Sequence, residues 1–305
     1  MIKKKHYLII AILAICLLST EVFLRTYYGF CDTVLLKEDV DFEYIALPNQ
    51  DRFRFRSRIL YNSKSMRSEE VSSTAKKILG FGDSIINGGV LTDQDSLATT
   101  ILSDSLTQRG GKEVQFLNIS AGSWGPDNCY AYLTKFGDFD ASHLFLFVSS
   151  HDAYDNMNFE KVVDIHKSFP SKQYSFALAE LLDRYLIPRL FTSKKKLASD
   201  EKNIGINKKT PNSAFNTGFN SFLSYTTLHN IPFTIYLHAD KEELKQGSYN
   251  EQGLEIITFA KENKISIILD LENNLKMSDF RDDIHINEKG QRKLALTIFA
   301  YLNKT

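Results

Sequence analysis

Two short strings contain the residue types needed for nucleophilic chemistry. GFGDS (residues 80–84) ends a short apolar run, and DDIH (residues 282–285) lies just before the last predicted helix. A serine hydroxyl becomes a nucleophile when an imidazole takes its proton, and a carboxylate on the other ring nitrogen fixes the imidazole tautomer. Asp282 precedes His285 by three residues, a spacing that folds the carboxylate back onto the ring in a loop. The strings predict a Ser84–His285–Asp282 triad that requires no cofactor and no metal.

Two further strings follow apolar runs between these two. NISAG (residues 118–122) ends one run, and SSHD (residues 149–152) ends another. Donors at the carboxyl ends of neighbouring parallel strands meet at one edge of a sheet, where they can stabilise a developing oxyanion. Each string alone is more typical of an ordinary turn. Their order along the chain is the specific signal.

This order of blocks resembles the SGNH/GDSL hydrolase family over roughly residues 76–305. The resemblance implies that Ser84 is the nucleophile, that Asp282 and His285 complete the triad, and that the amides of Ser84 and Gly122 bind the oxyanion. It also implies a three-layer α/β/α sandwich with a central parallel sheet, the flavodoxin-like SGNH hydrolase fold.

The third block departs from the family pattern. It normally reads Gly-x-Asn-Asp, and its asparagine is the third oxyanion donor, but here His151 stands at that position. A ring N–H can also donate, so we expect Ser84, Gly122 and His151 to form the oxyanion hole. Loss of one such donor typically costs about 10²–10³ in rate. A degenerate, non-catalytic site is the alternative that this departure leaves open.

Several residues near the blocks are candidates for substrate binding. Trp124 and Tyr154 are interpreted as an aromatic platform for a sugar ring, with plain packing as the alternative. Asn87 follows the nucleophile and is expected to line the pocket. His238 follows another strand end and is expected to be an ordinary loop histidine. The lysine-rich stretch 193–213 is expected to be a solvated loop.

The elements that must position these residues alternate along the chain. Apolar runs predict strands, and apolar residues at helical spacing predict helices between them. Such alternation is typical of a parallel sheet covered on both faces. The predicted strands are 78–82, 114–119, 144–148, 233–237 and 265–269, and the predicted helices are 94–108, 127–136, 174–192, 214–229, 251–263 and 288–302.

The N-terminus reads as a membrane segment. Three lysines (residues 3–5) precede an apolar run at residues 7–18 that continues less purely to residue 24. A bilayer span needs roughly 20 mostly apolar residues, and a signal peptide needs fewer. We favour an uncleaved anchor over a cleaved signal, and a buried core helix is disfavoured. The lysines predict that the remainder lies outside the cytoplasm, in the periplasm or at the cell surface. The predicted division is 1–25 anchor or signal, 26–75 stalk and lead-in segment, and 76–305 catalytic domain.

Composition narrows the function. The 305-residue chain has a formal net charge of zero, which argues against nucleic acid as a partner. Its three cysteines specify no disulfide framework, although pairing of Cys31 with Cys129 in an oxidising compartment stays open. The favoured function is hydrolysis of acyl esters, above all O-acetyl groups on envelope or exported carbohydrate. The alternatives are a polysaccharide O-acetyltransferase with the same triad and a non-catalytic glycan-binding or assembly protein. The sequence does not set the oligomeric state.

Overall fold

The computed structural model describes residues 2–191 and 214–304 and is built around a five-stranded parallel sheet. Its strand order is β6-β5-β7-β8-β9. Each strand is one of the predicted apolar runs, and β7 is buried at every position. The strands are β5 (Lys76–Gly82), β6 (Val114–Ser120), β7 (Leu144–Ser149), β8 (Phe233–His238) and β9 (Ser266–Leu269).

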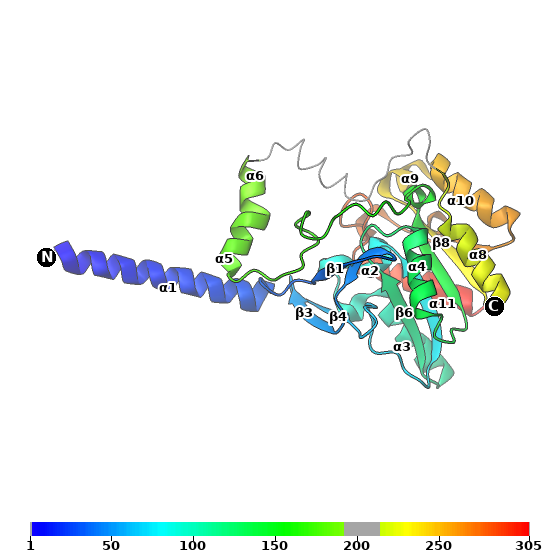
Figure 1. Cartoon of the computed structure of the whole chain (residues 1–305), viewed down its shortest axis with the longest axis horizontal. Helices are drawn as coiled ribbons and strands as arrows, with labels where there is room; N and C mark the ends of the chain where they lie inside the picture. Colours follow the sequence, from blue (N-terminus) through cyan, green and yellow to red (C-terminus); the bar gives the residue numbers. More distant parts are fainter. Residues whose placement is uncertain (1, 192–213, 305) are drawn as a thin grey trace.

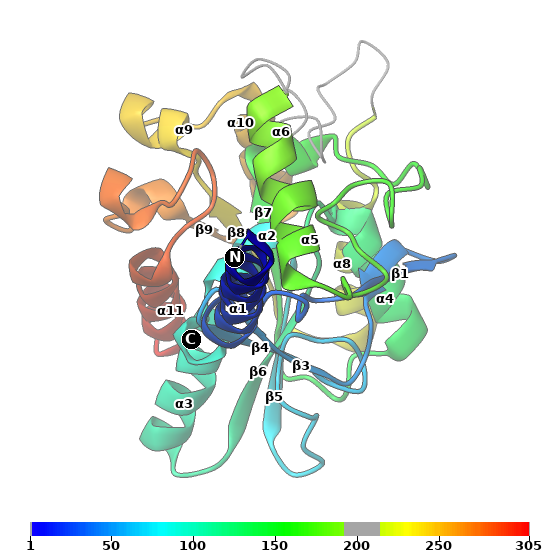
Figure 2. The same ribbon diagram turned by 90° about the vertical axis from the view of Figure 1, so that its left-hand side faces the viewer.

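Helices cover both faces of this sheet (Figures 1 and 2). Buried Leu102 of α3 and Leu294 of α11 belong to one apolar cluster. Tyr132 of α4, Phe222 of α8 and Ile256 of α10 belong to another on the opposite face. The predicted three-layer sandwich is therefore confirmed. The helices are α3 (Ala98–Gly110), α4 (Pro126–Phe136), α8 (Gly218–His229), α9 (Lys241–Gln246), α10 (Glu251–Glu262) and α11 (Glu288–Leu302).

The strand order contains a switch point between β5 and β7. The chain goes outward from β5 to β6 and then returns to the other side of β5 to form β7. In open α/β sheets the crevice outside the carboxyl ends of the strands at such a point is the usual ligand site. A single helical turn, α2 (Ser84–Asn87), follows β5, and a short turn, η3 (Ser150–Ala153), follows β7.

Residues 26–75 include the end of α1 and two antiparallel hairpins, and the segment packs against the sandwich. These are β1 (Leu36–Asp39) with β2 (Glu43–Ala46), and β3 (Gln50–Arg54) with β4 (Ser57–Tyr61). Phe42, Ile45 and Met66 are buried in the same apolar cluster as Tyr132. The segment thus contributes to the core. The domain boundaries at residues 25 and 75 stay predictions.

The N-terminal helix α1 (Ile2–Tyr28) projects from the sandwich (Figure 1). From Lys4 it is long and apolar enough to cross a membrane, with a mean hydropathy of 2.4, and only 6% of its most apolar window is buried. This exposure excludes a buried core helix. An anchor and a signal sequence meet the same length and composition test, so the choice between them stays a prediction.

A second helical segment runs across α1. It comprises α5 (Ala177–Glu180), a π-helical stretch, η4 (Leu181–Leu186), and α6 (Ile187–Phe191). The predicted helix at 174–192 is found here as residues 177–191, and Pro188, which cannot donate a backbone hydrogen bond, is the second residue of α6, after the π-helical stretch. The predicted lysine-rich loop lies outside the described residues. Cys31 and Cys129 are free thiols, and Cys129 is buried.

Candidate active site

Ser84, His285 and Asp282 form one hydrogen-bonded line. The Ser84 hydroxyl lies 2.9 Å from His285 Nε2, and His285 Nδ1 lies 2.8 Å from Asp282 Oδ2. With Nδ1–H donating to the carboxylate, Nε2 is left to accept the serine proton. The serine and the histidine are 201 residues apart in the chain, so only the fold brings them together.

The loop around Asp282 is held by the same carboxylate. Its Oδ1 accepts the amides of Ile284 at 3.0 Å and His285 at 2.7 Å. Burial alone would raise the pKa of Asp282, but the hydrogen bonds from the His285 ring and amide outweigh it and hold that pKa well below its usual value. Asp282 is therefore ionised at neutral pH. Its side chain is 50% exposed and that of His285 is 38% exposed, so this end of the triad lies open to water.

Ser84 follows β5 at a tightly packed turn. Asp83 accepts the Ile85 amide at 2.8 Å and caps the single turn that begins with Ser84. A Cβ at Gly82 would lie 2.9 Å from the Phe147 carbonyl oxygen, which only glycine avoids. Ser84 is partly exposed although its neighbours Asp83 and Ile85 are buried. The strand end thus presents one hydroxyl from an otherwise buried turn.

A buried histidine supports the loop that carries His285. His238, at the end of β8, contacts Asp270 Oδ2 through Nδ1 at 2.6 Å and the Ile284 carbonyl through Nε2 at 2.8 Å. Both acceptors require a ring proton, so this geometry fits an imidazolium. The Tyr236 hydroxyl donates to the other Asp270 oxygen at 2.7 Å. His238 is thus no ordinary loop histidine, because it is buried and holds the backbone between Asp282 and His285.

Sequence reasoning missed this pair, yet a signal for it existed. Asp270 directly follows β9, and His238 ends β8, so the two lie at the carboxyl ends of adjacent strands. The carboxyl ends of adjacent parallel strands meet at one edge of the sheet, and this reasoning predicts that His238 and Asp270 lie close together.

Gly122 lies at the end of the predicted second block. The Tyr44 hydroxyl donates to its carbonyl at 2.6 Å, which fixes the orientation of the peptide. A Cβ at Gly122 would meet no atom within 4 Å, so the residue borders open space. Its amide has no acceptor among the described residues. These features suit an amide donor, and its role in an oxyanion hole stays a proposal.

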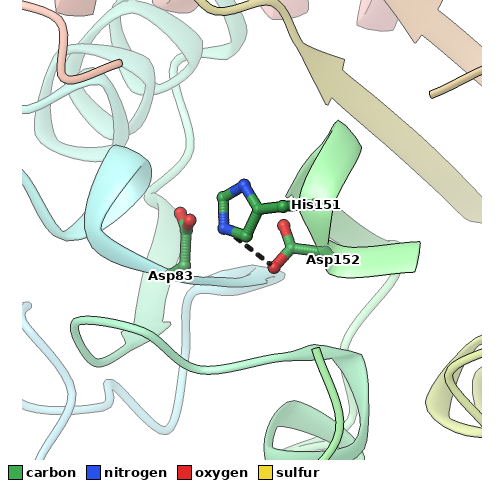
Figure 3. A group of neighbouring side chains, drawn as sticks. All are labelled: Asp83, His151 and Asp152. Carbon is green, nitrogen blue, oxygen red and sulfur yellow. Dashed lines mark ion pairs between the residues drawn. The ribbon is translucent and has the colours of Figure 1, made fainter. Parts of the chain in front are cut away.

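His151 lies beside two buried carboxylates. Its ring faces Asp83 and Asp152 (Figure 3), and His151 Nε2 lies 3.6 Å from Asp152 Oδ1. Asp152 Oδ2 accepts the Ser149 amide at 2.6 Å, whereas Oδ1 is buried with no hydrogen-bond partner. Burial, and then the negative charge of Asp83, raise the pKa of Asp152 well above its usual value. The second ring nitrogen of His151 points away from both carboxylates (Figure 3).

The same three side chains are the ones among the described residues that could hold a metal ion. One ligand atom from each lies within 4.8 Å of the others. Asp83 and Asp152 each already accept a hydrogen bond from a backbone amide. The atoms left as possible metal ligands are one imidazole nitrogen and the remaining carboxylate oxygens. None of these atoms belongs to Ser84, His285 or Asp282, which form the hydrogen-bonded line.

Trp124 and Tyr154 do not form a sugar platform. Trp124 is only 1% exposed, and its indole N–H donates to the Tyr44 carbonyl at 3.0 Å. Its ring packs against Phe42 at a centroid distance of 5.4 Å. Tyr154 is 8% exposed and its hydroxyl donates to Glu255. The predicted platform is wrong because both rings are core residues.

Asn87 is likewise not a pocket residue. It is buried, and its amide donates to the Tyr61 hydroxyl at 3.0 Å and to the Ser120 hydroxyl at 3.1 Å. These bonds tie α2 to β6 and to the β4 hairpin. Asn87 therefore stabilises the turn that carries Ser84 and has no side-chain atom left for substrate.

Comparisons with known proteins add little beyond the fold. No protein-family model and no curated protein matches the chain. Similar solved structures include a lipolytic protein of the G-D-S-L family from Veillonella parvula DSM 2008, at 14% identity and a TM-score of 0.43, covering 76% of this chain and all 100% of that one. A lipase/acylhydrolase from Enterococcus faecalis has 14% identity and a TM-score of 0.43, over 75% of this chain and 96% of that one. A variant of an acetyl-xylooligosaccharide esterase from Geobacillus Stearmophilus has 9% identity and a TM-score of 0.43, over 74% and 94%. At these values the function must be argued from the site.

Proposed function

We propose that this chain is a serine esterase of the SGNH/GDSL type that removes acyl groups through an acyl-serine intermediate. One observation carries the proposal. The Ser84 hydroxyl, the His285 imidazole and the Asp282 carboxylate form a continuous line with links of 2.9 Å and 2.8 Å. That line is the arrangement that activates a serine hydroxyl on many unrelated folds.

The proposed reaction has two halves. His285 Nε2 takes the Ser84 proton while the hydroxyl oxygen attacks the ester carbonyl. The tetrahedral adduct collapses to acyl-Ser84, and the imidazolium gives its proton to the leaving alkoxide, which departs as an alcohol. Water then attacks the acyl-serine with His285 as base, and the acid is released as Ser84 is reprotonated. Asp282 keeps Nδ1 protonated throughout.

The oxyanion is proposed to be held by the amides of Ser84 and Gly122 and by His151. Removal of one such donor typically costs about 10²–10³ in kcat. Because His151 Nε2 faces Asp83 and Asp152, only the other ring nitrogen is left to donate. That nitrogen carries a proton in one of the two neutral tautomers of an imidazole as well as in the charged ring. His151 is therefore proposed to donate through this N–H, at the position where the family pattern has an asparagine amide.

The proposed substrate is an O-acylated carbohydrate, with acetyl as the acyl group. Support comes from the N-terminal helix and its leading lysines, which predict a domain tethered at the outer side of the membrane, where envelope and exported glycans are found. An O-acetyltransferase would use the same triad. Hydrolysis is favoured over transfer because Asp282 and His285 are 50% and 38% exposed, and transfer requires that water be excluded.

The test uses the purified full chain in detergent with an aryl acetate. The wild type should release the phenol and show an acetyl group on Ser84 by peptide mass mapping. Ser84→Ala should abolish both signals. The matched control is Ser142→Ala, because Ser142 lies at the amino end of β7 and donates only to the Lys77 carbonyl, at 3.0 Å. That variant should behave as the wild type.

The outcomes separate the three functions. Steady turnover in water indicates an esterase, whereas acyl-Ser84 that accumulates until an oligosaccharide is added indicates a transferase. If neither an aryl acetate nor an acetylated oligosaccharide gives Ser84-dependent acylation, the chain is a binding or assembly protein and the proposal is wrong.

A further inference from the structure

One helical segment presents apolar side chains to solvent. In the continuous segment Ala177–Phe191, formed by α5, η4 and α6, the exposed side chains recur at helical spacing along one face. The exposed apolar residues are Phe176 at 65%, which directly precedes the segment, and Leu182 at 49%, Leu186 at 38%, Ile187 at 46% and Leu190 at 74% within it. We call these five residues the apolar stripe. A helix that faces water has the opposite pattern.

The inner face of the same segment is charged. Glu180 is fully buried and accepts from Arg54 at 2.6 Å and from Arg184 at 3.0 Å. The Tyr185 ring packs against Phe30 at 5.6 Å between centroids. Because Arg54 and Phe30 belong to the part of the chain after α1, they hold the segment from the side of the globular domain. The apolar stripe therefore points away from that domain.

The start of α5 is bonded to α1. The Glu21 carboxylate accepts the amides of Ala177 at 2.7 Å and Leu178 at 2.9 Å, and Arg25 donates to the Ser175 carbonyl at 2.6 Å. From Lys4 to Glu21, α1 rises about 27 Å, close to the ~30 Å hydrocarbon core of a bilayer. The bonds are thus made where the apolar part of α1 ends.

The direction of the segment fits a membrane surface. Figure 1 shows α5 and α6 running across the axis of α1, and Figure 2, which looks along α1, shows them extending sideways from it. Just beyond Glu21, Tyr27 and Tyr28 of α1 are 43% and 37% exposed. Exposed tyrosines are typical of the interfacial zone next to a membrane span.

We propose that the segment Ala177–Phe191 lies in the plane of the bilayer surface with the apolar stripe among the lipid chains. The inference rests on the proposed membrane anchor and goes beyond it, because an anchor alone leaves the domain free to swing. A second contact beside α1, braced by the buried Arg54–Glu180 pair, sets the orientation of the domain relative to the bilayer. The occupant is phospholipid, since the stripe adjoins the end of the proposed span.

The test measures how deeply single tryptophans lie in vesicles. The full chain is reconstituted into phosphatidylcholine and phosphatidylglycerol vesicles whose phosphatidylcholine carries bromine on its acyl chains, which quenches nearby tryptophan. Reporters are Leu186→Trp in the stripe, Leu13→Trp in α1 and Leu228→Trp as the control. Leu228 is 81% exposed on α8, on the far side of the domain from α1 (Figure 1). The native Trp124 is 1% exposed in the core and provides a constant background.

We expect the Leu13→Trp and Leu186→Trp signals to lose most of their added fluorescence and the Leu228→Trp signal to keep it. If Leu13→Trp is quenched while Leu186→Trp behaves as Leu228→Trp, the anchor holds and the interfacial helix is wrong. If none is quenched, the anchor itself is wrong and the inference falls with it. A Leu186→Trp emission that shifts to the blue without quenching would show that protein, such as a second copy, covers the stripe. None of these results depends on Ser84, so the esterase proposal is tested separately.

Discussion

Replacement of His238 should damage catalysis through the loop that carries the triad base. His238 and Asp270 are 1% and 6% exposed and lie 2.6 Å apart, and the other His238 nitrogen is bonded to the Ile284 carbonyl. His238→Gln removes a charge from this buried pair. Breaking a buried ion pair by removing one partner costs about 3–5 kcal/mol, a large part of the 5–15 kcal/mol that holds a typical protein folded.

Catalysis should fall as well, because Ile284 lies between Asp282 and His285. A misplacement of about 1 Å at a catalytic group costs up to about 10² in rate. We therefore expect His238→Gln to lower kcat on an aryl acetate by about 10- to 100-fold with little change in KM. Thermal unfolding and steady-state kinetics on the same preparation measure both effects.

Two further variants separate positioning from stability. In His238→Leu/Asp270→Leu no charge is left buried, so the stability should recover in large part, yet the Ile284 carbonyl still lacks its donor and kcat should stay low. His143→Gln is the matched control, because His143 is buried at the other end of the sheet and bonds to the Thr234 hydroxyl at 2.8 Å. It should lose stability and keep kcat. Full recovery of kcat in the double variant would refute a positioning role for His238.

The pH dependence has a definite sign. Burial lowers the pKa of His238, but the Asp270 carboxylate outweighs burial and leaves that pKa above its ordinary value. When the pKa of a group is higher in the folded state than in the unfolded state, its protonation stabilises the fold. That stabilisation is complete below the unfolded-state pKa, about 6.5 for histidine, and it is lost as the pH rises through the folded-state pKa. The stability difference between the wild type and the double leucine variant should therefore shrink on the alkaline side.

Three other outcomes are expected. His151→Asn should retain or raise kcat on an aryl acetate, because an asparagine amide can replace the ring N–H as the third donor; a collapse of kcat would contradict simple donor replacement. Burial and the neighbouring Asp152 raise the pKa of Asp155 to about 8. Between about pH 4 and pH 8 the Asp155 carboxyl ionises in the unfolded chain but not in the folded protein, so the wild type loses stability as the pH rises through this range. Asp155→Asn should therefore raise the unfolding temperature more at pH 8 than at pH 5, and an equal change at both would contradict the shift. EDTA should leave kcat unchanged, since no step uses a metal; a loss restored by Zn²⁺ or Mn²⁺ would show that Asp83, His151 and Asp152 hold an ion.

The sheet and the triad were accessible from sequence because their signals are local. Each strand is an apolar run of a few residues, and Asp282 reaches His285 within one loop turn. The meeting of Ser84 with His285 followed from strand order, since parallel strands place their ends at one edge. The meeting of these residues could thus be predicted from short strings together with the order of the strands.

The aromatic residues were misread because burial is a tertiary property. Trp124 follows a strand end, as a pocket residue would, but its ring is enclosed by Phe42 from the first hairpin and Tyr132 from α4. No pattern near residue 124 encodes these partners. Asn87 was misread for the same reason, because its partners Tyr61 and Ser120 come from distant segments.

The least periodic part of the sequence, residues 26–75, connects the membrane side of the molecule to the nucleophile. Arg54 at the end of β3 binds Glu180 of α5 at 2.6 Å. A few residues after β4, the fully buried Arg67 donates to the carbonyls of Asn87 and Gly89 and, at 2.6 Å, to that of Thr92, all in the turn that follows Ser84. Polar side chains that bridge distant elements produce no periodic pattern of apolar residues, so the contacts of this segment could not be predicted from the sequence. Its two buried guanidinium groups nonetheless tie this segment to two sites: Arg54 binds the helix proposed to rest on the bilayer, and Arg67 binds the turn that follows Ser84. The hairpin segment and the bonds between α1 and α5 would therefore together set how the sheet edge that carries Ser84 is oriented relative to the proposed bilayer contact.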